Sequence, residues 1–368
     1  MEVRDFSKIG KTLEVPDLNA VQRRSYEEFL QLHTRPTERE DEGLEAVIRE
    51  VFPIENEDGN VKLNYVYYTL GEPRFTPDEC RRLELTYGYP FRVRVRLKIK
   101  DEVQEQDVYL GEMPAMLGGG EFIVNGSERI IVTQLHRAPG CDFSSEKRGE
   151  DRLYSCRIIP ERGSWIEMET SRRDKLGCRL DRSSKMPATL LLKTLTEDYA
   201  DEESILELFY ALEEIKFTEG TAAARLRDRV SAQRIAVGED ELELIAPGEI
   251  ITDDKAQQLA EAGVEKIKVL PEGADPLILE TLDDDNSTDH RSAVKELYSR
   301  LRPGTPFNFQ KARQTLWEKF FDENRYQLGK VGRFRMNRKF GENVPEEQQT
   351  LRVQDVINAI RYIFKLRK

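Results

Sequence analysis

The side chains best suited to chemistry follow a short apolar hairpin. Two apolar runs flank Asn125-Gly126, the commonest pair for a tight hairpin, because both central residues of a type I′ turn need a positive φ. Beyond the second run stand an amide, an imidazole and a guanidinium, on Gln134, His136 and Arg137. This pattern predicts a rigid support that presents polar groups to a ligand. A buried hairpin with an ordinary surface loop is the alternative.

Two basic stretches could contact the phosphates of a nucleic acid. In residues 91–100, apolar and basic side chains alternate strictly, which is typical of a half-buried strand. Its outer face carries Arg92, Arg94, Arg96, Lys98 and Lys100. The alternative is a solvated face paired with acidic residues of the following strand, namely Glu102, Glu105 and Asp107. The second stretch, 329–339, interleaves basic and apolar residues.

No self-sufficient active site is indicated. The sequence contains no phosphate-binding P-loop, no nucleophile elbow, no zinc-protease motif and no dinucleotide fingerprint. The histidines number only 3, and the 4 cysteines are dispersed without a C-x-x-C pair, so neither a zinc site nor a structural disulfide is expected. The net charge of −12 argues against a free-standing nucleic-acid binder. A subunit with local basic faces is compatible with this net charge.

The length of 368 residues predicts two domains or more. No apolar run approaches the ~20 residues of a membrane span, and the first residues lack the apolar region of a secretory signal. We therefore expect a cytoplasmic protein.

Hydrophobic periodicity predicts an α+β protein. Helices are expected over 18–33, with Asp17 as a possible N-cap, and over 44–51, 188–195 and 205–212. Strands are expected over 61–70, 91–100, 104–110, 153–159, 165–169 and 178–182. The acidic segment 220–285 is predicted to be a compact β-α-β insertion, with a solvated loop at Asp283-Asp284-Asp285.

Three helices are expected to complete the chain, the last over 353–368. This helix carries an apolar face of Val353, Val356, Ile357, Ile360 and Phe364, and it reaches Lys368 without a glycine or proline. We therefore expect that the chain is cut rather than finished, and that this apolar face is uncovered.

Several blocks of the sequence resemble the N-terminal part of the bacterial DNA-directed RNA polymerase β subunit. In chain order they are VPDLNAVQRRSYEEFL, LEAVIREVFPIENEDGNVKLNYVYYTLGEPRF, DVYLGEMPAMLGGGEFIVNGSERIIVTQLHRAPG, RIIPERGSWIEME, LDRSSKMPATLLLKTL, LRPGTPFNF and VGRFRMNRKF. Together they cover nearly the whole chain.

The resemblance implies an α+β architecture. Residues 1–126 would form the first half of a mixed sheet-and-helix protrusion domain, and 127–368 an α+β lobe domain with a lineage-type acidic insertion at about 220–285. Later β-subunit regions would be absent. The implied activity is transcription of DNA into RNA by a nucleotidyltransferase, with this chain alone not catalytic. No cofactor is implied in this chain, and Mg²⁺ is expected on the β′ partner.

The implied partners are DNA (the non-template strand and the downstream duplex), nearby nascent RNA, the β′ and α subunits, a sigma factor and proteins of the transcription-repair coupling factor type. No membrane is implied, and the implied location is the cytoplasm, at the nucleoid. A free-standing, non-enzymatic interaction module that reuses these domains is the alternative.

The resemblance also carries over residue roles. The edge of the rifamycin pocket beside the RNA path matches Arg129, Val132 and Gln134. The pocket for an unstacked guanine of the non-template strand matches Arg137, Trp165, Asp181 and Arg182, where Asp181 could accept from the Watson–Crick edge of guanine. The edge that docks transcription factors matches Val103, Gln104 and Glu105, and relatives often have lysine in place of Gln104.

Each role has a structural alternative. Trp165 could be a core residue, and Arg137 and Asp181 could form an ordinary surface pair. Val132 lies in an apolar run, which favours packing as its primary role.

Overall fold

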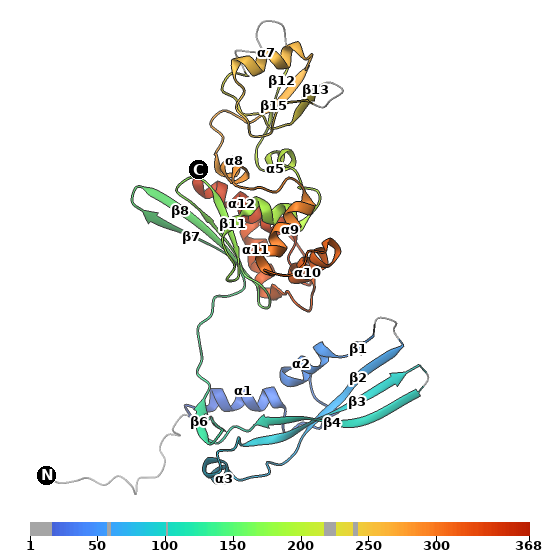
Figure 1. Ribbon diagram of the computed structural model, residues 1–368. Helices are drawn as coiled ribbons and strands as arrows, with labels where there is room; N and C mark the ends of the chain where they lie inside the picture. The colour runs from blue at the N-terminus through green and yellow to red at the C-terminus, as the bar shows by residue number, and fades with distance from the viewer. Residues whose placement is uncertain (1–16, 57–59, 101, 217–225, 238–241) are drawn as a thin grey trace, which may run out of the picture. The chain divides into compact units, whose positions relative to one another are not determined.

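The computed structural model describes residues 17–56, 60–100, 102–216, 226–237 and 242–368. The chain divides into two compact units, Met1–Leu135 and His136–Lys368, here called the first and the second unit (Figure 1). The predicted domain boundary at 126 falls inside the hairpin of β5 (Glu121–Val124) and β6 (Ser127–Ile130), which pair antiparallel. The observed division therefore lies nine residues later than 126, after Leu135.

The first unit is a twisted antiparallel sheet with helices packed on it. Besides the β5–β6 hairpin, its elements are α1 (Ala20–Leu30), α2 (Gly43–Val51), β1 (Ile54–Glu55), β2 (Val61–Leu70), α3 (Pro77–Arg82), β3 (Gly88–Ile99) and β4 (Glu102–Pro114). The four-stranded sheet has the order β1-β2-β3-β4, so β4 is an edge strand.

The core of the first unit lies between the sheet and the two helices α1 and α2. It is formed by Leu30, Leu44, Ile48, Tyr68 and Val93. The Tyr68 hydroxyl donates to the carbonyl of Leu30 over 2.6 Å, which ties α1 to β2. The expectation that Asp17 caps α1 is wrong: Asn19 is the N-cap residue, and the Asp17 carboxylate accepts from the Asn19 backbone N–H instead.

The second unit combines one larger sheet with a bundle of helices. Its sheet elements are β7 (Gly140–Arg148), β8 (Asp151–Ile159), β9 (Ile166–Thr170), β10 (Leu176–Leu180) and β11 (Met186–Pro187), in the order β11-β10-β9-β8-β7. The helices are α4 (Ala188–Leu195), α5 (Glu202–Phe209), α8 (Leu277–Asp283), α9 (His290–Leu301), α10 (Phe309–Phe321), α11 (Gly329–Phe340) and α12 (Val353–Arg367). Both units mix sheet and helix, which confirms the predicted α+β class.

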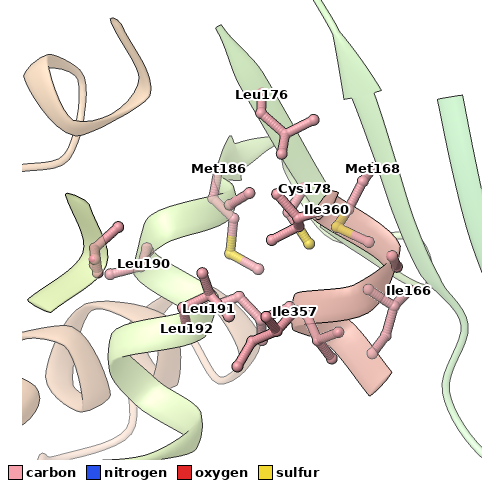
Figure 2. Close-up of a cluster of buried hydrophobic side chains, with 14 of the residues drawn as sticks. Ile166, Met168, Leu176, Cys178, Met186, Leu190, Leu191, Leu192, Ile357 and Ile360 are labelled. Atoms are coloured by element: carbon pink, nitrogen blue, oxygen red, sulfur yellow. The ribbon is translucent and has the colours of Figure 1, made fainter. Parts of the chain in front are cut away.

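The apolar face of α12 is covered, so the expectation of an exposed patch was wrong. Of the predicted face, Val356, Ile357 and Ile360 are buried, and Val353 and Phe364 are partly buried against the same core. The helix packs against β8 and α4, with Ile360 beside Met168 and Cys178 of the sheet and Ile357 toward Leu191 and Leu192 of α4 (Figure 2). The covering surface belongs to the same unit, because α12 is a central element of its core.

The acidic insertion has a small core of its own and is shorter than predicted. Its elements are β12 (Glu213–Lys216), β13 (Ile235–Val237), β14 (Leu242–Ile245), α7 (Asp253–Glu261) and β15 (Lys266–Val269). Thr252 caps α7, with its side chain accepting from the Lys255 N–H. The predicted start of the segment, Gly220, lies outside the described residues. Its end at 285 is wrong, since α8 packs against α4 and α5 of the main core.

The predicted solvated loop at 283–285 is wrong for Asp285. This carboxylate is buried, accepts from the Thr189 hydroxyl over 2.7 Å, and lies 3.3 Å from the buried Lys193 ammonium. A buried charge of this kind is tolerated because it is both paired and hydrogen-bonded. The run of carboxylates therefore ends α8 and connects it to α4.

The basic stretch 329–339 is helix α11, and two of its arginines are structural. The fully buried Arg333 donates to Asp355 of α12 at 2.9 and 3.0 Å, and to the carbonyls of Gln348 and Thr350. Arg335 donates to Asp142 of β7 over 2.9 Å. These contacts use the guanidinium groups that the sequence offered for phosphate binding.

We expect Arg333→Met to destabilise the second unit by about 3 kcal/mol, because it leaves a buried carboxylate with fewer partners. Because Arg352 still donates to Asp355, the loss of stability should be at the lower end of the usual range for breaking a buried ion pair. The measurement is urea unfolding followed by tryptophan emission, since Trp165 and Trp317 both lie in this unit.

The matched control is Arg338→Met, which removes an exposed arginine from the same helix and should change stability by less than about 0.5 kcal/mol. A loss for Arg333→Met no larger than that of the control would contradict the structural role of the pair.

Candidate nucleic-acid interface

The indole of Trp165 stands on a tight turn that enters strand β9. Gly163 precedes it with a φ of 124°, in a region that side chains rarely adopt, and Trp165 itself is half-buried outside the core clusters. The alternative of a core tryptophan is therefore wrong. The ring of His136 meets the indole edge-to-face, with centroids 5.9 Å apart. The result is an aromatic platform, defined here as His136 and Trp165.

Asp181, just after β10, binds the backbone of Trp165 at two points. Its carboxylate Oδ1 accepts from the Trp165 N–H over 2.8 Å, and its own N–H donates to the Trp165 carbonyl over 3.0 Å. Asp181 has a φ of 51°, a left-handed conformation that aspartate tolerates better than most residues. The other oxygen, Oδ2, accepts from the Lys319 ammonium of α10 over 3.1 Å. The alternative of an Arg137–Asp181 pair is wrong, because the ion partner is Lys319.

The turn before Trp165 is anchored on the segment that precedes α11. The backbone N–H groups of Glu161 and Arg162 donate to the Gln327 carbonyl at 2.8 and 3.0 Å, and the Gln327 N–H donates back to Arg162 over 2.7 Å. A Cβ on Gly163 would come within 2.7 Å of the Tyr326 ring. Burial raises the pKa of Tyr326 well above its ordinary value, so this ring packs as a neutral phenol.

Two free cations accompany the platform. Arg137 and Arg182 are exposed, and neither has an ion pair among the described residues. The Nδ1–H of His136 donates to the Arg137 carbonyl over 2.7 Å. Next along the chain, the carbonyls of Ala138 and Pro139 accept from Arg335, each over 2.8 Å. The backbone of residues 137–139 is thus held by hydrogen bonds, whereas the guanidinium of Arg137 has no ion pair among the described residues.

These groups are suited to an unpaired base with its phosphates. An indole offers a flat face for stacking, and unpaired guanidinium groups attract phosphate or stack on a base. The structure brings Trp165 and Asp181 into direct contact, with His136 on the indole. Arg137 is joined to the platform through its backbone, and Arg182 adjoins Asp181 in sequence.

The residues predicted to border the RNA path belong to the first unit. Arg129 lies in β6, opposite Phe122, and its side chain is exposed. The strand ends at Ile130, so Val132 and Gln134 lie beyond it and are exposed. Val132 is 65% exposed, so packing as its primary role is wrong.

Two of the five cations in the row on β3 are paired, as the alternative held, whereas Arg92, Lys98 and Lys100 are exposed and have no ion pair among the described residues. Arg96 lies 2.6 Å from Glu105, and Arg94 lies 3.2 Å from Asp107 and 3.5 Å from Glu105, all across the β3–β4 ladder. The hydrogen bond from Arg96 holds the pKa of Glu105 below its ordinary value. Arg94 and Arg96 are therefore not available to a nucleic acid without breaking these pairs.

The predicted docking edge lies on the outer strand of the first sheet. In the described part of the chain, β4 pairs with β3 alone, and Val103, Gln104 and Glu105 are all exposed. Val103 is 55% exposed, whereas Glu105 is held by the arginines of β3. The free apolar contact at this edge is therefore Val103.

Lys319 and Tyr326 were missed by sequence reasoning. Lys319 is 138 residues from Asp181 in sequence, and nothing in its own helix distinguishes it from other surface lysines. The apolar neighbours of Tyr326 predict burial but not its contact with Gly163. Neither partner could have been found without the fold.

Within the described ranges, no group of three or more histidine, cysteine, aspartate or glutamate side chains is arranged to hold a metal ion. The helices described there also include none long and apolar enough to cross a membrane.

Comparison with known proteins identifies the family of the chain. The family model described as RNA polymerase beta subunit matches residues 17–118, and that of RNA polymerase Rpb2, domain 2, matches residues 269–368. The chain is 44% identical to the DNA-directed RNA polymerase subunit beta of Rhodopirellula baltica, an alignment that covers 100% of this chain and 30% of the relative. For the proteins of the same name from Methylacidiphilum infernorum and Chlamydia muridarum, the identities are 39% and 37%, over 99% and 96% of this chain and 29% of each relative.

The chain belongs to the family of DNA-directed RNA polymerase β subunits. It spans about 30% of the length of these curated relatives.

We expect Gly163→Ala to destabilise the second unit by about 2 kcal/mol more than Gly149→Ala, because its methyl group meets Tyr326 as well as an unfavourable φ. Gly149 is the matched control, with a φ of 74° and nothing within 4 Å of an added Cβ. Urea unfolding followed by tryptophan emission measures both variants. Equal losses would show that the turn is not held by Tyr326.

Proposed function

We propose that the chain works as part of a DNA-directed RNA polymerase, in the transcription of DNA into RNA. Its family membership supports this proposal, and the coverage of about 30% of its relatives makes the whole enzyme's activity an inference. Nucleotidyl transfer would belong to the assembled complex, with Mg²⁺ on the β′ partner and this chain not catalytic alone. The other partners would be the α subunits, a sigma factor, DNA and nascent RNA, at the nucleoid in the cytoplasm.

The first unit would be half of the protrusion domain and the second unit the lobe domain. Within the second unit, we propose that the platform contacts the non-template strand at the downstream edge of the bubble. The residues of the proposed pocket are Arg137, Trp165, Asp181 and Arg182. The observation that carries this proposal is the half-exposed indole of Trp165, held by hydrogen bonds to the backbone and side chain of Asp181, with exposed arginines next in sequence to His136 and Asp181.

The physical argument is that single-stranded DNA needs a flat apolar surface for its bases and positive charge for its backbone. A fixed indole supplies the flat apolar surface at a low cost in conformational entropy. Arg137 and Arg182 supply the positive charge for the DNA backbone without first breaking an ion pair. The net charge of −12 makes such local cations the part of the surface that attracts DNA.

Two further surfaces belong to this proposal. Arg129, Val132 and Gln134 would border the nascent RNA and the rifamycin pocket, which their exposed side chains permit. The edge at Val103, Gln104 and Glu105 would accept a strand from a transcription-repair coupling factor type protein. Unpaired edge strands are suited to strand addition.

We expect Trp165→Ala to weaken binding of a single-stranded oligodeoxynucleotide by about 1–3 kcal/mol, which is the usual loss when an aromatic stacking partner of a base is removed. The measurement is the fluorescence anisotropy of a labelled oligonucleotide with the polymerase that contains this chain.

Trp317→Ala is the matched control, because Trp317 is 55% exposed on α10 and is not part of the platform. An unchanged affinity for Trp165→Ala, or an equal loss in both variants, would exclude the stacking role.

We expect Val103→Asp to weaken binding of the coupling-factor type partner by more than about 1 kcal/mol, because a charge on the free edge opposes strand addition and removes an apolar contact. Val108→Asp is the control, since Val108 lies on the same strand beyond the proposed edge and is 38% exposed. A titration of the purified partner against each variant measures the difference. Equal losses would place the contact elsewhere on β4.

A further inference from the structure

We propose that Lys319 and Asp181 act together as a latch that positions Trp165, and that Asp181 does not read the base. This inference rests on the proposed stacking function of Trp165 and assigns its control to two residues beside it. Both are positioning residues, since they act through the indole.

The carboxylate of Asp181 already has a partner on each oxygen. Oδ1 accepts from the Trp165 N–H over 2.8 Å, and Oδ2 accepts from Lys319 over 3.1 Å. A bidentate contact with guanine has both oxygens facing the N1–H and N2–H donors of one base, so the second lone pair of each oxygen would have to point toward that base while the first stays bound. A carboxylate that lies between the tryptophan backbone and a lysine is oriented for support instead.

The backbone reinforces this orientation. The Asp181 N–H donates to the Trp165 carbonyl over 3.0 Å, so the two residues form a closed ring of hydrogen bonds. The left-handed φ of 51° at Asp181 is what turns its N–H and carboxylate toward the same neighbour. Rotation of the carboxylate would break the Oδ1 bond and free one side of the tryptophan turn.

Lys319 prevents that rotation from a rigid base. It projects from α10, which is anchored in the core by Leu316 and Phe320. Its side chain is 26% exposed and that of Asp181 43% exposed. The pair therefore contributes little to overall stability, but it connects α10 to the end of β10 and fixes the carboxylate rotamer.

The consequence for recognition is that this half of the pocket is tolerant of base identity. Every base has a face that can stack on an indole, so a well-positioned Trp165 binds each of them. Loss of the latch should then weaken all bases alike. A direct reader would instead show a loss confined to guanine.

The test uses a Trp317→Phe background, in which Trp165 is the only tryptophan of the chain. Acrylamide quenching of its emission reports how firmly the indole is held. Anisotropy of four labelled single-stranded oligonucleotides, identical except for one base, reports affinity. The variants are Lys319→Met, Lys319→Arg, Asp181→Asn and Asp181→Ala.

We expect Lys319→Met to raise the quenching constant about twofold and to weaken all four oligonucleotides about fivefold, the lower end of the loss of one stacked base. Lys319→Arg should restore most of both, because it keeps the ion pair. Asp181→Ala should change both the quenching constant and the affinity more than Lys319→Met does. The effects of Asp181→Asn should fall between those of the two, because its amide oxygen still accepts from the Trp165 N–H.

The control is Lys311→Met, an exposed lysine of the same helix with the same loss of charge and no ion pair among the described residues. If Lys319→Met matches this control in quenching and affinity, the latch is excluded. If Asp181→Ala weakens only the guanine oligonucleotide, Asp181 is a reader and the inference is wrong. If Trp165→Ala binds all four normally, the proposed function fails, while the quenching data still decide whether the latch exists.

Discussion

The second unit depends on one buried charge pair between two helices. The guanidinium of Arg333 in α11 donates to Asp355 and to the carbonyls of Gln348 and Thr350, so it fixes the loop that joins α11 to α12. Gln349, in that loop, accepts from the Leu328 N–H over 2.7 Å. The neighbouring Gln327 then binds the turn that carries Trp165. A core interaction therefore sets the position of a surface aromatic ring.

Burial and pairing determine which cations are structural and which are available to a ligand. Arg333 and Arg335 are bound to carboxylates and carbonyls, and Arg94 and Arg96 are neutralised across a strand pair. Arg137 and Arg182 remain exposed without such partners in the described residues. In a chain with a net charge of −12, such unpaired arginines are local positive charges near the site in sequence. In each of the two basic stretches, two arginines are therefore structural or paired.

Local patterns predicted elements well where one face was apolar and the other polar. The strict alternation of residues 91–100 identified most of β3, and Asn125-Gly126 identified the β5–β6 hairpin. The same reasoning missed β7, because most of its side chains beyond Phe143 are polar and exposed. It also missed helix α11, since arginines occupy a buried position and an anchoring position there. In both cases the stabilising contacts come from distant segments, which local periodicity does not contain.

The candidate site shows the same limit more sharply. Trp165 and Asp181 were named from the sequence, and they do meet in the structure. The structure adds that each oxygen of the carboxylate has a partner within the protein, which the sequence did not indicate. A residue's chemical ability to accept a hydrogen bond does not reveal whether that ability is already used. Lys319, separated from Asp181 by 138 residues, binds the second oxygen, and the proposed positioning role of Asp181 rests on this contact.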